Sequence, residues 1–294
     1  WITFFGSEFN RFNTEDFTSL QSFEVSYETK LITIGGININ ESDVVWHRRG
    51  RLRHVPKELI RTSKVYDYLK KEEDSLIKSL EIFLRLKTNY IGSYLKEIEN
   101  YKLNNLIIAS LVGLRIPKTL VTTSKCDLLD FVEKQATISK DIRYPLNIKT
   151  SEKYISSIGT FEIKKDEVEL LDNEFSPVFS QELIYKEFEI RVFFIDNRFY
   201  SMDIFSQNDE KTKLDYRNYN EEKQNRCVPF TLPEHIRKKL IAFKNEINIR
   251  TGSIDLIYST SGKYIFLEIN PMGQFDWVSK NCNYYIEKDI AEYL

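Results

Sequence analysis

The sequence predicts a mixed α/β protein with several lobes, and three observations lead to this prediction. The chain has 294 residues, and about 150 residues is an ordinary domain length, so about two domains or one large multi-lobed domain are expected. Hydrophobic residues make up 41% of the chain, which is ample for a buried core. Segments with strand-like alternation and segments with helical spacing follow one another along most of the chain.

The first third of the chain is expected to contain short strands and then helices. Residues 31–36 and 43–47 are typical of short β-segments, because each is followed by turn residues. Apolar residues recur at helical spacing through residues 62–88, which predicts one or two long helices. A further helix is predicted over residues 100–114, with Gly113 ending it.

The middle of the chain alternates between the two kinds of element. A helix is predicted over residues 125–134. Short strands are predicted on both sides of it, at residues 118–122, 136–142, 153–163 and 177–183. A β-hairpin then follows, with strands at residues 188–195 and 199–206 and a turn at Asp196-Asn197.

The last part of the chain contains a long polar stretch, a helix and a second hairpin. Residues 208–226 are rich in acidic and basic side chains, and loops of that length are usually functional or mobile. An amphipathic helix is predicted over residues 233–249. The second hairpin has strands at residues 253–259 and 263–269, with its turn at Ser261-Gly262.

Composition argues against several classes of protein. With 42 basic and 44 acidic residues the net charge is −2, so a nucleic-acid partner is not expected. The three cysteines show neither a disulfide framework nor metal-ligand spacing, which is typical of reduced thiols in the cytoplasm. No signal peptide is visible and the longest apolar run, residues 106–114, is too short to cross a bilayer, so no membrane partner is expected. None of the three histidines lies near a serine or cysteine motif, which leaves a hydrolase triad unsupported.

The second hairpin carries the most informative chemistry. Glu268 and Asn270 are two residues apart on one predicted strand, so their side chains share a face, and close pairing puts Asp255 across from them. Two carboxylates and an amide oxygen are hard ligands that suit Mg²⁺. Each residue alone is more simply interpreted as part of a half-exposed sheet. The three together favour a metal site.

This hairpin, with its Asp-bearing strand and the run L-E-I-N-P, resembles the metal-binding C-terminal part of the ATP-grasp superfamily. The resemblance implies an ATP-grasp fold in which two lobes enclose ATP and Mg²⁺. Residues 177–191 (PVFSQELIYKEFEIR) resemble the hinge strand of that superfamily. By resemblance Gln181, Glu182 and Leu183 form the hinge that presents backbone groups to adenine, although Glu182 could also be an ordinary exposed strand carboxylate. Glu189 would contact the ribose, and Leu267 would lie under the purine.

Two lysines are nominated for the nucleotide by the same resemblance. Lys102 lies on a predicted helix that leads into G-L-R-I-P-K-T, as the first nucleotide lysine of the superfamily does. Taken by itself it would be an ordinary surface lysine. Lys140 lies in A-T-I-S-K-D-I, which resembles the strand that carries the second lysine. Lysine is a compact cation that suits phosphate oxygens.

A narrower resemblance covers nearly the whole chain. Residues 189–207, the run D-Y-R at 215–217 and residues 267–275 resemble the peptide maturases of graspetide systems, that is, the microviridin-type macrocyclases and their grasp-with-spasm relatives. The run D-V-V-W-H-R-R at 43–49 resembles the Trp-x-Arg-Arg segment of that group. The opening residues resemble the second element of its pre-ATP-grasp domain, so the first strand is expected to be missing. The implied domains are an N-terminal pre-ATP-grasp domain, a central subdomain and a C-terminal subdomain, at residues 1–95, 96–180 and 181–294.

The resemblance implies an ADP-forming ligase that acts on a ribosomal precursor peptide with a leader and a core. Asp or Glu side chains of the peptide would be activated as acyl phosphates, and Ser, Thr or Lys side chains would then close ω-ester or ω-amide rings. Arg191 shares a strand face with Glu189 and is expected to contact phosphate or acyl phosphate. Asp215 and Arg217 are candidate contacts for the core peptide, or else a solvated pair of no consequence. The arginines at 48, 49, 51 and 53 fit an acidic peptide better than a nucleic acid.

Several alternatives stay open at this point. Another ATP-grasp ligase, of the glutamate-ligase type that adds amino acids to a peptide, would have the same nucleotide site. A module that binds nucleotide or peptide without turnover is a second alternative, and the intact metal set argues against it. No glycine-rich phosphate loop is visible, since residues 154–161 contain one glycine. The oligomeric state, including a homodimer, is also open.

Overall fold

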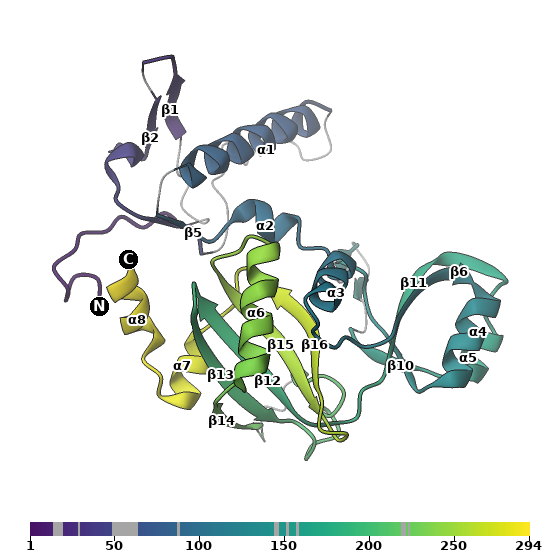
Figure 1. The fold of residues 1–294 in the computed structure, drawn as a ribbon. Helices are drawn as coiled ribbons and strands as arrows, with labels where there is room; N and C mark the ends of the chain where they lie inside the picture. Colours follow the sequence, from purple (N-terminus) through teal and green to yellow (C-terminus); the bar gives the residue numbers. More distant parts are fainter. Residues whose placement is uncertain are drawn as a thin grey trace.

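The computed structural model describes residues 1–13, 20–28, 30–48, 64–86, 89–143, 147–150, 153–156, 159–218, 222 and 224–294. Helices and strands are mixed along the chain, which confirms the predicted fold class. A body built on a large β-sheet lies in the middle of the molecule, with the N-terminal elements on one side and a projecting lobe on the other (Figure 1).

The N-terminal part contains a three-stranded antiparallel sheet and a long helix, namely β1 (Leu20–Val25), β2 (Lys30–Ile34), β3 (Ile37–Asn38) and α1 (Lys64–Arg85). Ile32 and Ile34 of β2 pack with Leu80 and Leu84 of α1. This cluster buries the C-terminal part of the apolar stripe that the sequence places along residues 62–88, and the described part of that segment, Lys64–Arg85, forms one helix rather than two.

Short elements connect this part to the body: η1 (Ile39–Glu41), β4 (Val45–Trp46), β5 (Tyr90–Ile91), α2 (Tyr94–Ile98) and α3 (Lys102–Leu111). The strands β4 and β5 pair in parallel. Gly113 follows α3 with a φ of +80°, a conformation that favours glycine, so the predicted helix end is confirmed.

The projecting lobe is a four-stranded antiparallel sheet with two helices on one face (Figure 1). Its sheet order is β10-β7-β11-β6, and its elements are β6 (Thr119–Ser124), α4 (Lys125–Lys134), β7 (Thr137–Ser139), β10 (Phe161–Ile163), α5 (Lys165–Glu169) and β11 (Glu174–Glu182). A separate hairpin, β8 (Asn147–Lys149) with β9 (Tyr154–Ser156), precedes β10. The single strand predicted over 153–163 is therefore wrong: β9 and β10 belong to different sheets, and Gly159 between them has a φ of +85°.

The body is a five-stranded antiparallel sheet in the order β14-β13-β12-β15-β16. Its strands are β12 (Lys186–Ile195), β13 (Arg198–Phe205), β14 (Arg226–Phe230), β15 (Thr251–Ser259) and β16 (Tyr264–Asn270). Both predicted hairpins are confirmed, since β12 pairs with β13 and β15 pairs with β16. The predicted domain boundary between residues 180 and 181 falls inside β11.

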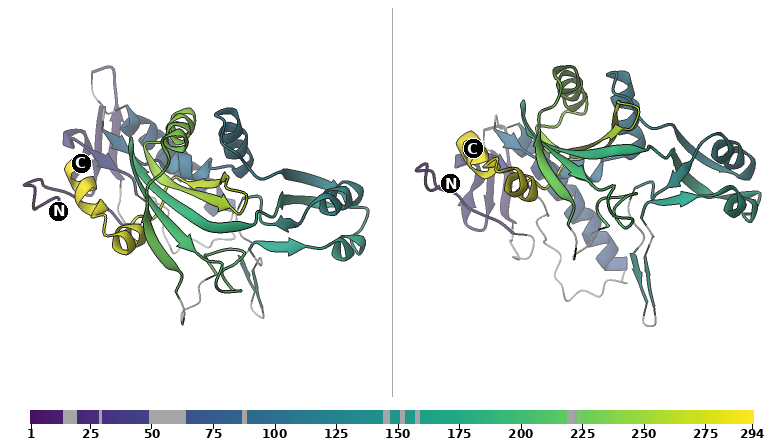
Figure 2. Two further views of the ribbon diagram at one scale, coloured as in Figure 1. Left: turned by 60° about the horizontal axis from the view of Figure 1, so that its bottom comes forward. Right: turned by 90° about the horizontal axis from the view of Figure 1, so that it is seen from below.

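Helices cover the two faces of this sheet (Figure 2). On one face lies α6 (Glu234–Glu246), where Leu240 and Phe243 pack with Ile254 and Phe266. Part of the other face is covered by α7 (Asp276–Cys282) and α8 (Ile286–Tyr293), which the sequence did not predict. Among the described residues, no helix is long and apolar enough to span a membrane.

Candidate active site

The hairpin of β15 and β16, called the metal hairpin below, has the pairing that the sequence predicts. Asp255 on β15 lies directly opposite Glu268 on β16, and Ser253 lies opposite Asn270. The register shifts just beyond Asp255, because Leu256 pairs with Phe266 and Leu267 is therefore left as an extra residue. Asp255 is buried, with 7% of its surface exposed, whereas Asn270 is exposed. The two carboxylates thus sit side by side at the edge of the buried sheet face.

Each hairpin carboxylate is bound by an arginine from another part of the chain. The Nη1 atom of Arg191, on β12, donates to Oδ1 and Oδ2 of Asp255 at 2.9 and 2.8 Å. The Nη1 atom of Arg217, in the polar segment after β13, donates to Oε1 of Glu268 at 3.2 Å. Arg217 also donates to the carboxylate of Asp215, from Nε to Oδ1 at 2.8 Å and from Nη2 to Oδ2 at 2.7 Å. Five residues predicted separately as metal ligands, phosphate contacts or peptide contacts therefore form three ion pairs.

The pKa values of Asp255 and Asp215 are shifted in opposite directions. Burial raises the pKa of Asp255 above its usual range, and Arg191 only partly offsets this effect. Burial alone would also raise the pKa of Asp215, but the hydrogen bonds and the charge of Arg217 outweigh it, so that pKa lies below its usual range. Asp215 is consequently a firmly ionised anchor for Arg217.

A cavity of about 330 Å³ opens beside the hairpin. The charged side chains of Arg191, Arg217, Asp255 and Glu268 line one part of this cavity. Most of the other lining residues are uncharged. The lining residues that the sequence reasoning missed are Glu97, Tyr216, Met272, Gln274 and Trp277. The rings of Tyr216 and Trp277 stack, with centroids 6.0 Å apart and planes at 23°. Tyr216 lies inside the run D-Y-R, so its position beside two predicted site residues was an available signal, whereas nothing in the sequence marks Glu97.

The two predicted lysines lie near Glu268, and neither lines the cavity. Lys102, the first residue of α3, donates through Nζ to the carbonyl of Asp141 at 2.7 Å. The ammonium group of Lys140, just after β7, lies 5.6 Å from the centre of the Phe179 ring. Burial lowers the pKa of both lysines, and the nearby charge of Glu268 opposes that change in each case. Both cations are therefore close enough to Glu268 for its charge to act on them.

The predicted ribose contact has partners within the chain. Glu189 is buried, forms an ion pair with Lys186 and accepts a hydrogen bond from Oγ of Ser206 at 2.6 Å. Burial raises its pKa, and Lys186 opposes the rise. A ribose hydroxyl would have to share or replace these contacts, so the role of Glu189 stays a prediction.

The predicted hinge is tied to its neighbours through its N–H groups. The N–H of Glu182 donates to the carbonyl of Lys118 at 2.9 Å, and that of Leu183 donates to Ala136 at 2.8 Å. The side chain of Gln181 is buried and donates to Oγ1 of Thr119 at 2.9 Å. In this arrangement the N–H groups are not available to a purine, so adenine recognition by these three residues stays a prediction, as does the apolar contact from Leu267, which is half-buried.

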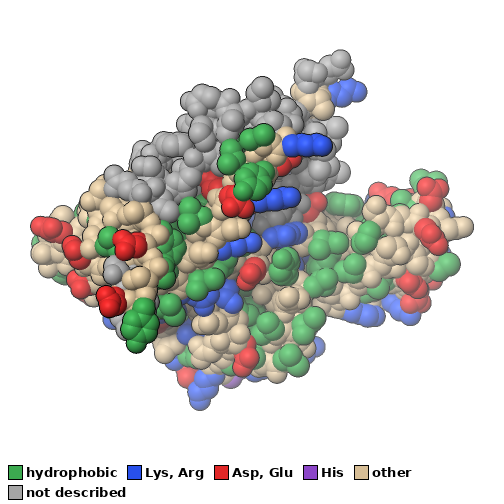
Figure 3. Space-filling model, turned by 90° about the horizontal axis from the view of Figure 1, so that it is seen from above, with side chains coloured by type: hydrophobic (Ala, Val, Ile, Leu, Met, Phe, Trp, Pro, Cys, Tyr) green, Lys and Arg blue, Asp and Glu red, His purple; other side chains and the backbone are tan. Residues whose placement is uncertain are grey.

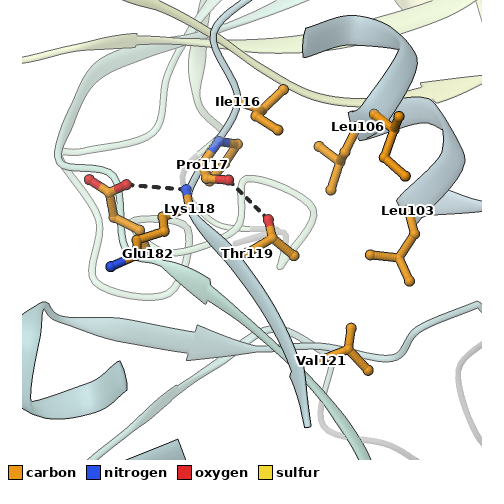
Figure 4. Close-up of a pocket in the computed structure, with 9 residues that line it drawn as sticks. Leu103, Leu106, Ile116, Pro117, Lys118, Thr119, Val121 and Glu182 are labelled. Atoms are coloured by element: carbon orange, nitrogen blue, oxygen red, sulfur yellow. Dashed lines mark hydrogen bonds between the residues drawn. The ribbon is translucent and has the colours of Figure 1, made fainter. Parts of the chain in front are cut away.

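A larger cavity, of about 510 Å³, lies on the other side of the hinge, between α3 and β6. Figure 4 shows apolar side chains around it, with Glu182 turned toward the N–H of Lys118 at 3.2 Å. Hydrophobic side chains also gather on the surface between the body and the projecting lobe (Figure 3), where Ile107 and Val121 are exposed. Lys118 is its one cationic lining residue. The smaller cavity, which carries paired charges, is therefore the better candidate for chemistry on anions.

Two further regions contact residues that lie next to the cavity lining in the sequence, namely Phe275 and Asp215. Arg48 lies with its guanidinium 4.4 Å from the centre of the Phe275 ring and 5.7 Å from that of Trp46. The predicted arginines at 49, 51 and 53 lie outside the described residues. On the other side, Oγ1 of Thr160, next to β10, donates to Oδ2 of Asp215 at 3.4 Å, which links the projecting lobe to the polar segment.

The donor set at the hairpin fits Mg²⁺. Its hard oxygen donors are of the kind that magnesium prefers, and it usually completes its coordination with water and substrate phosphates. Among the described residues, no group of three or more His, Cys, Asp or Glu side chains could hold a metal ion. The predicted set contains two carboxylates and one amide, so water or the phosphate oxygens of a nucleotide would complete the coordination.

Comparison with known proteins places this site in context. No family model matches the chain, and no curated protein shows significant similarity to it. A solved structure of a RiPP-associated ATP-grasp ligase from Chryseobacterium gregarium, in complex with ADP and a leader and core peptide, matches with a TM-score of 0.86 and 25% identity, over 100% of this chain and 90% of that one. The chain has the fold of the RiPP-associated ATP-grasp ligases.

Two more solved structures agree with this fold. The macrocyclase MdnC from Microcystis aeruginosa, bound with precursor peptide MdnA, has a TM-score of 0.80 and 26% identity, over 100% of this chain and 92% of that one. The ATP-grasp ligase PsnB, complexed with minimal precursor, Mg and ADP, has a TM-score of 0.77 and 18% identity, over 99% of this chain and 89% of that one. The graspetide resemblance given by the sequence is thereby confirmed at the level of an ATP-grasp ligase fold.

Proposed function

We propose that the chain is an ADP-forming ligase that closes ω-ester or ω-amide rings in a ribosomal precursor peptide. The observation that carries the proposal is the gathering of four cations around the metal hairpin. Lys102, Lys140 and Arg217 act on Glu268, and Arg191 binds Asp255. Such a concentration of positive charge around two carboxylates suits a nucleotide triphosphate that arrives with a divalent cation.

The residues divide into a nucleotide group and a peptide group. Asp255, Glu268 and Asn270 would hold Mg²⁺, which when bound neutralises charge on phosphoryl oxygens. Lys102 and Lys140 would bind phosphate oxygens as compact cations. Because Lys140 lies in the projecting lobe whereas Lys102 and the hairpin belong to the body, closure of the lobes would bring phosphate and metal together.

Arg191 is the best candidate for contact with the reacting carboxylate. It is buried, it lines the cavity, and its Nε has no hydrogen-bond partner among the described residues. Buried donors are nearly always satisfied, so an unpaired Nε on a side chain that lines the cavity supports an acceptor brought by a ligand. A carboxylate or acyl phosphate oxygen would supply that acceptor.

The reaction proceeds in two steps. A carboxylate oxygen of the peptide attacks the γ-phosphorus of ATP, and ADP leaves, so that an acyl phosphate forms. A hydroxyl or amine of the same peptide then attacks the acyl carbon. The bond between that carbon and the phosphate oxygen breaks, phosphate leaves with the electron pair, and the nucleophile gives up one proton. Positioning matters most here, because the second nucleophile is already tethered to the first group. Asp215 and Arg217 are proposed to position the core peptide.

The decisive experiment is incubation with a cognate precursor peptide, ATP and Mg²⁺. The product should lose one water for each ring, and ADP and phosphate should appear in equal amounts. The leader peptide should bind by itself and raise the rate, since remote binding energy can position the core. Asp215→Ala and Arg217→Ala should impair ring closure more than ADP binding.

Other products would decide against the proposal. A product heavier by one amino acid would indicate an amino-acid ligase, and release of AMP would exclude acyl phosphate chemistry. Ring closure that proceeds unchanged in Arg217→Ala would preserve the enzyme class but would remove the peptide role of Arg217. Nucleotide binding without any turnover would favour a binding module.

A further inference from the structure

The two arginine pairs at the hairpin differ in how firmly they are held. Arg191 and Asp255 are both buried, with side chains 9% and 10% exposed, and their contact is 2.8 Å. Arg217 is 53% exposed and its contact with Glu268 is longer, at 3.2 Å. Both of the predicted anionic metal ligands therefore hold a guanidinium group of the chain itself.

We propose that Arg217 is the exchangeable counter-ion of the metal site: it occupies Glu268 until a metal-nucleotide arrives and then turns its Nη1 toward a substrate anion. This inference rests on the proposed function for the identity of the metal and the nucleotide. It adds a competition between Arg217 and the metal for one carboxylate, and it makes Arg217 a positioning residue before it contacts peptide.

The geometry of Arg217 suits such an exchange. Its Nε and Nη2 atoms form a fork on Asp215, and its backbone N–H donates to Oδ1 of the same carboxylate at 3.0 Å. Only Nη1 reaches Glu268. The side chain can therefore release Glu268 while its fork stays on Asp215, so a small rotation about a fixed anchor is sufficient.

Arg191 is built differently and is expected to stay in place. One nitrogen, Nη1, binds both oxygens of Asp255, and the residue is enclosed by the sheet and the cavity wall. Removing one partner of a buried pair leaves an uncompensated charge, which is strongly unfavourable. The Arg217–Glu268 pair, with side chains 53% and 22% exposed, carries a smaller penalty, because water already reaches both groups.

A counter-ion is needed because the hairpin places two carboxylates opposite each other. Each raises the energy of the other in the charged form, and a nearby cation relieves that repulsion. Lys102 and Lys140 act on Glu268 from a distance, but among the described residues only Arg217 forms an ion pair with it. Free divalent cations must displace Arg217, whereas a nucleotide brings phosphate oxygens that can accept the displaced guanidinium.

The test measures metal binding directly. Mn²⁺ is titrated into the nucleotide-free protein and free Mn²⁺ is followed by electron paramagnetic resonance. Arg217→Gln should bind Mn²⁺ about two- to fivefold more tightly than the unaltered chain, the range expected on removing a half-exposed ion pair. With ADP present the advantage should disappear, because the guanidinium then favours the bound state. Arg237→Gln, which removes the same charge from α6, is the matched control and should bind Mn²⁺ like the unaltered chain.

The remaining outcomes are also decisive. Equal or weaker Mn²⁺ binding by Arg217→Gln, including no binding at all, would overturn the counter-ion role. If that variant does not fold, Arg217→Lys is used, which keeps the charge but lacks the fork, and unchanged Mn²⁺ affinity in it would equally overturn the role. Glu268→Gln separates this inference from the proposed function: if it binds Mn²⁺-ADP as well as the unaltered chain, the metal assignment itself fails.

Discussion

The two faces of the five-stranded sheet are made by the same strands but differ in content. Along β12, Ile190, Val192 and Phe194 face α6 and belong to the main core, whereas Glu189 and Arg191 point to the opposite side. The α6 face is packed with apolar and aromatic side chains, and the opposite face carries the ion pairs and the cavity. Alternation along one strand thus separates the main core from the face that carries the ion pairs, and on that second face Phe193 and Ile195 pack in a smaller cluster with α7 and α8.

The α6 face also contains a row of aromatic residues that runs across the sheet. Four strands contribute one ring each, in the order Phe205, Phe188, Tyr258 and Tyr264, and Arg226 of the fifth strand lies with its guanidinium 5.4 Å from the centre of the Phe205 ring. The ring centres of Phe188 lie 5.6 Å from Phe205 and 5.0 Å from Tyr258, and Tyr258 lies 4.9 Å from Tyr264. Cross-strand aromatic pairs of this kind stabilise a sheet, which supports a structural role for this face.

The largest effect is expected at Glu268, on the chemical side of the comparison. Glu268→Gln should reduce ring closure by about a thousandfold or more, because loss of a charged metal ligand removes several kcal/mol of transition-state stabilisation. The thermal midpoint should change little. Glu246→Gln, an exposed position at the end of α6, is the control and should leave turnover unchanged. Near-normal turnover in Glu268→Gln would show that the face opposite α6 does not supply this metal ligand.

A smaller effect is expected at Lys140, which faces the site from the projecting lobe. Lys140→Ala should weaken ADP binding by about 1.5–3 kcal/mol if the lysine makes one charge-assisted hydrogen bond to phosphate. Isothermal calorimetry measures this directly, with Lys134→Ala, an exposed lysine of the same lobe, as control. Unchanged ADP affinity in Lys140→Ala would show that Lys140 does not bind the nucleotide.

The smallest effect concerns Asp203, which is the exception on the α6 face. It is buried, its Oδ1 has no partner among the described residues, and burial raises its pKa from 3.8 to about 7. The folded chain therefore binds this proton more tightly than the unfolded chain, so stability should fall as pH rises from about 4 to about 7.

Asp203→Asn should remove this dependence. The free energy of unfolding should rise by about 1–2 kcal/mol at pH 8 and by less at pH 5, as measured by urea unfolding at both values. A variant that is less stable at pH 8 would show that the Asp203 carboxylate has a favourable role, and the α6 face would then not be purely structural.

Local signals explain why most of the sheet could be predicted. The hairpin turns contain Asp196, with a φ of 45°, and Gly262, with a φ of 74°, and such residues mark turns in the sequence itself. The metal set was predictable for the same reason, since Asp255 and Glu268 lie on one hairpin. In contrast, α7 and α8 are short. The residues at their junction, Asn283 and Tyr285, adopt left-handed conformations, and because neither is a glycine the sequence does not mark these helix ends.

Long-range partners explain what the sequence could not provide. Arg217 and Glu268 are 51 residues apart, and Lys102 and Asp141 are 39 apart, so no local pattern connects them. Arg191 was expected to face phosphate, and its pairing with Asp255 depends on how β12 and β15 align. The cavity wall contributed by Glu97 follows from the placement of α2 against the body, which no motif in the chain encodes.

The stacked rings beside the cavity give the chain a natural optical reporter. Of its three tryptophans, Trp277 stacks on Tyr216, and Trp46 stacks on Phe275 with ring centres 6.2 Å apart. Tyr216 lies between Asp215 and Arg217, so any ligand that moves this segment changes the surroundings of an indole. The emission of the unlabelled protein, with Trp1 replaced by phenylalanine to lower the background, would then follow occupancy of the site in real time without an added dye.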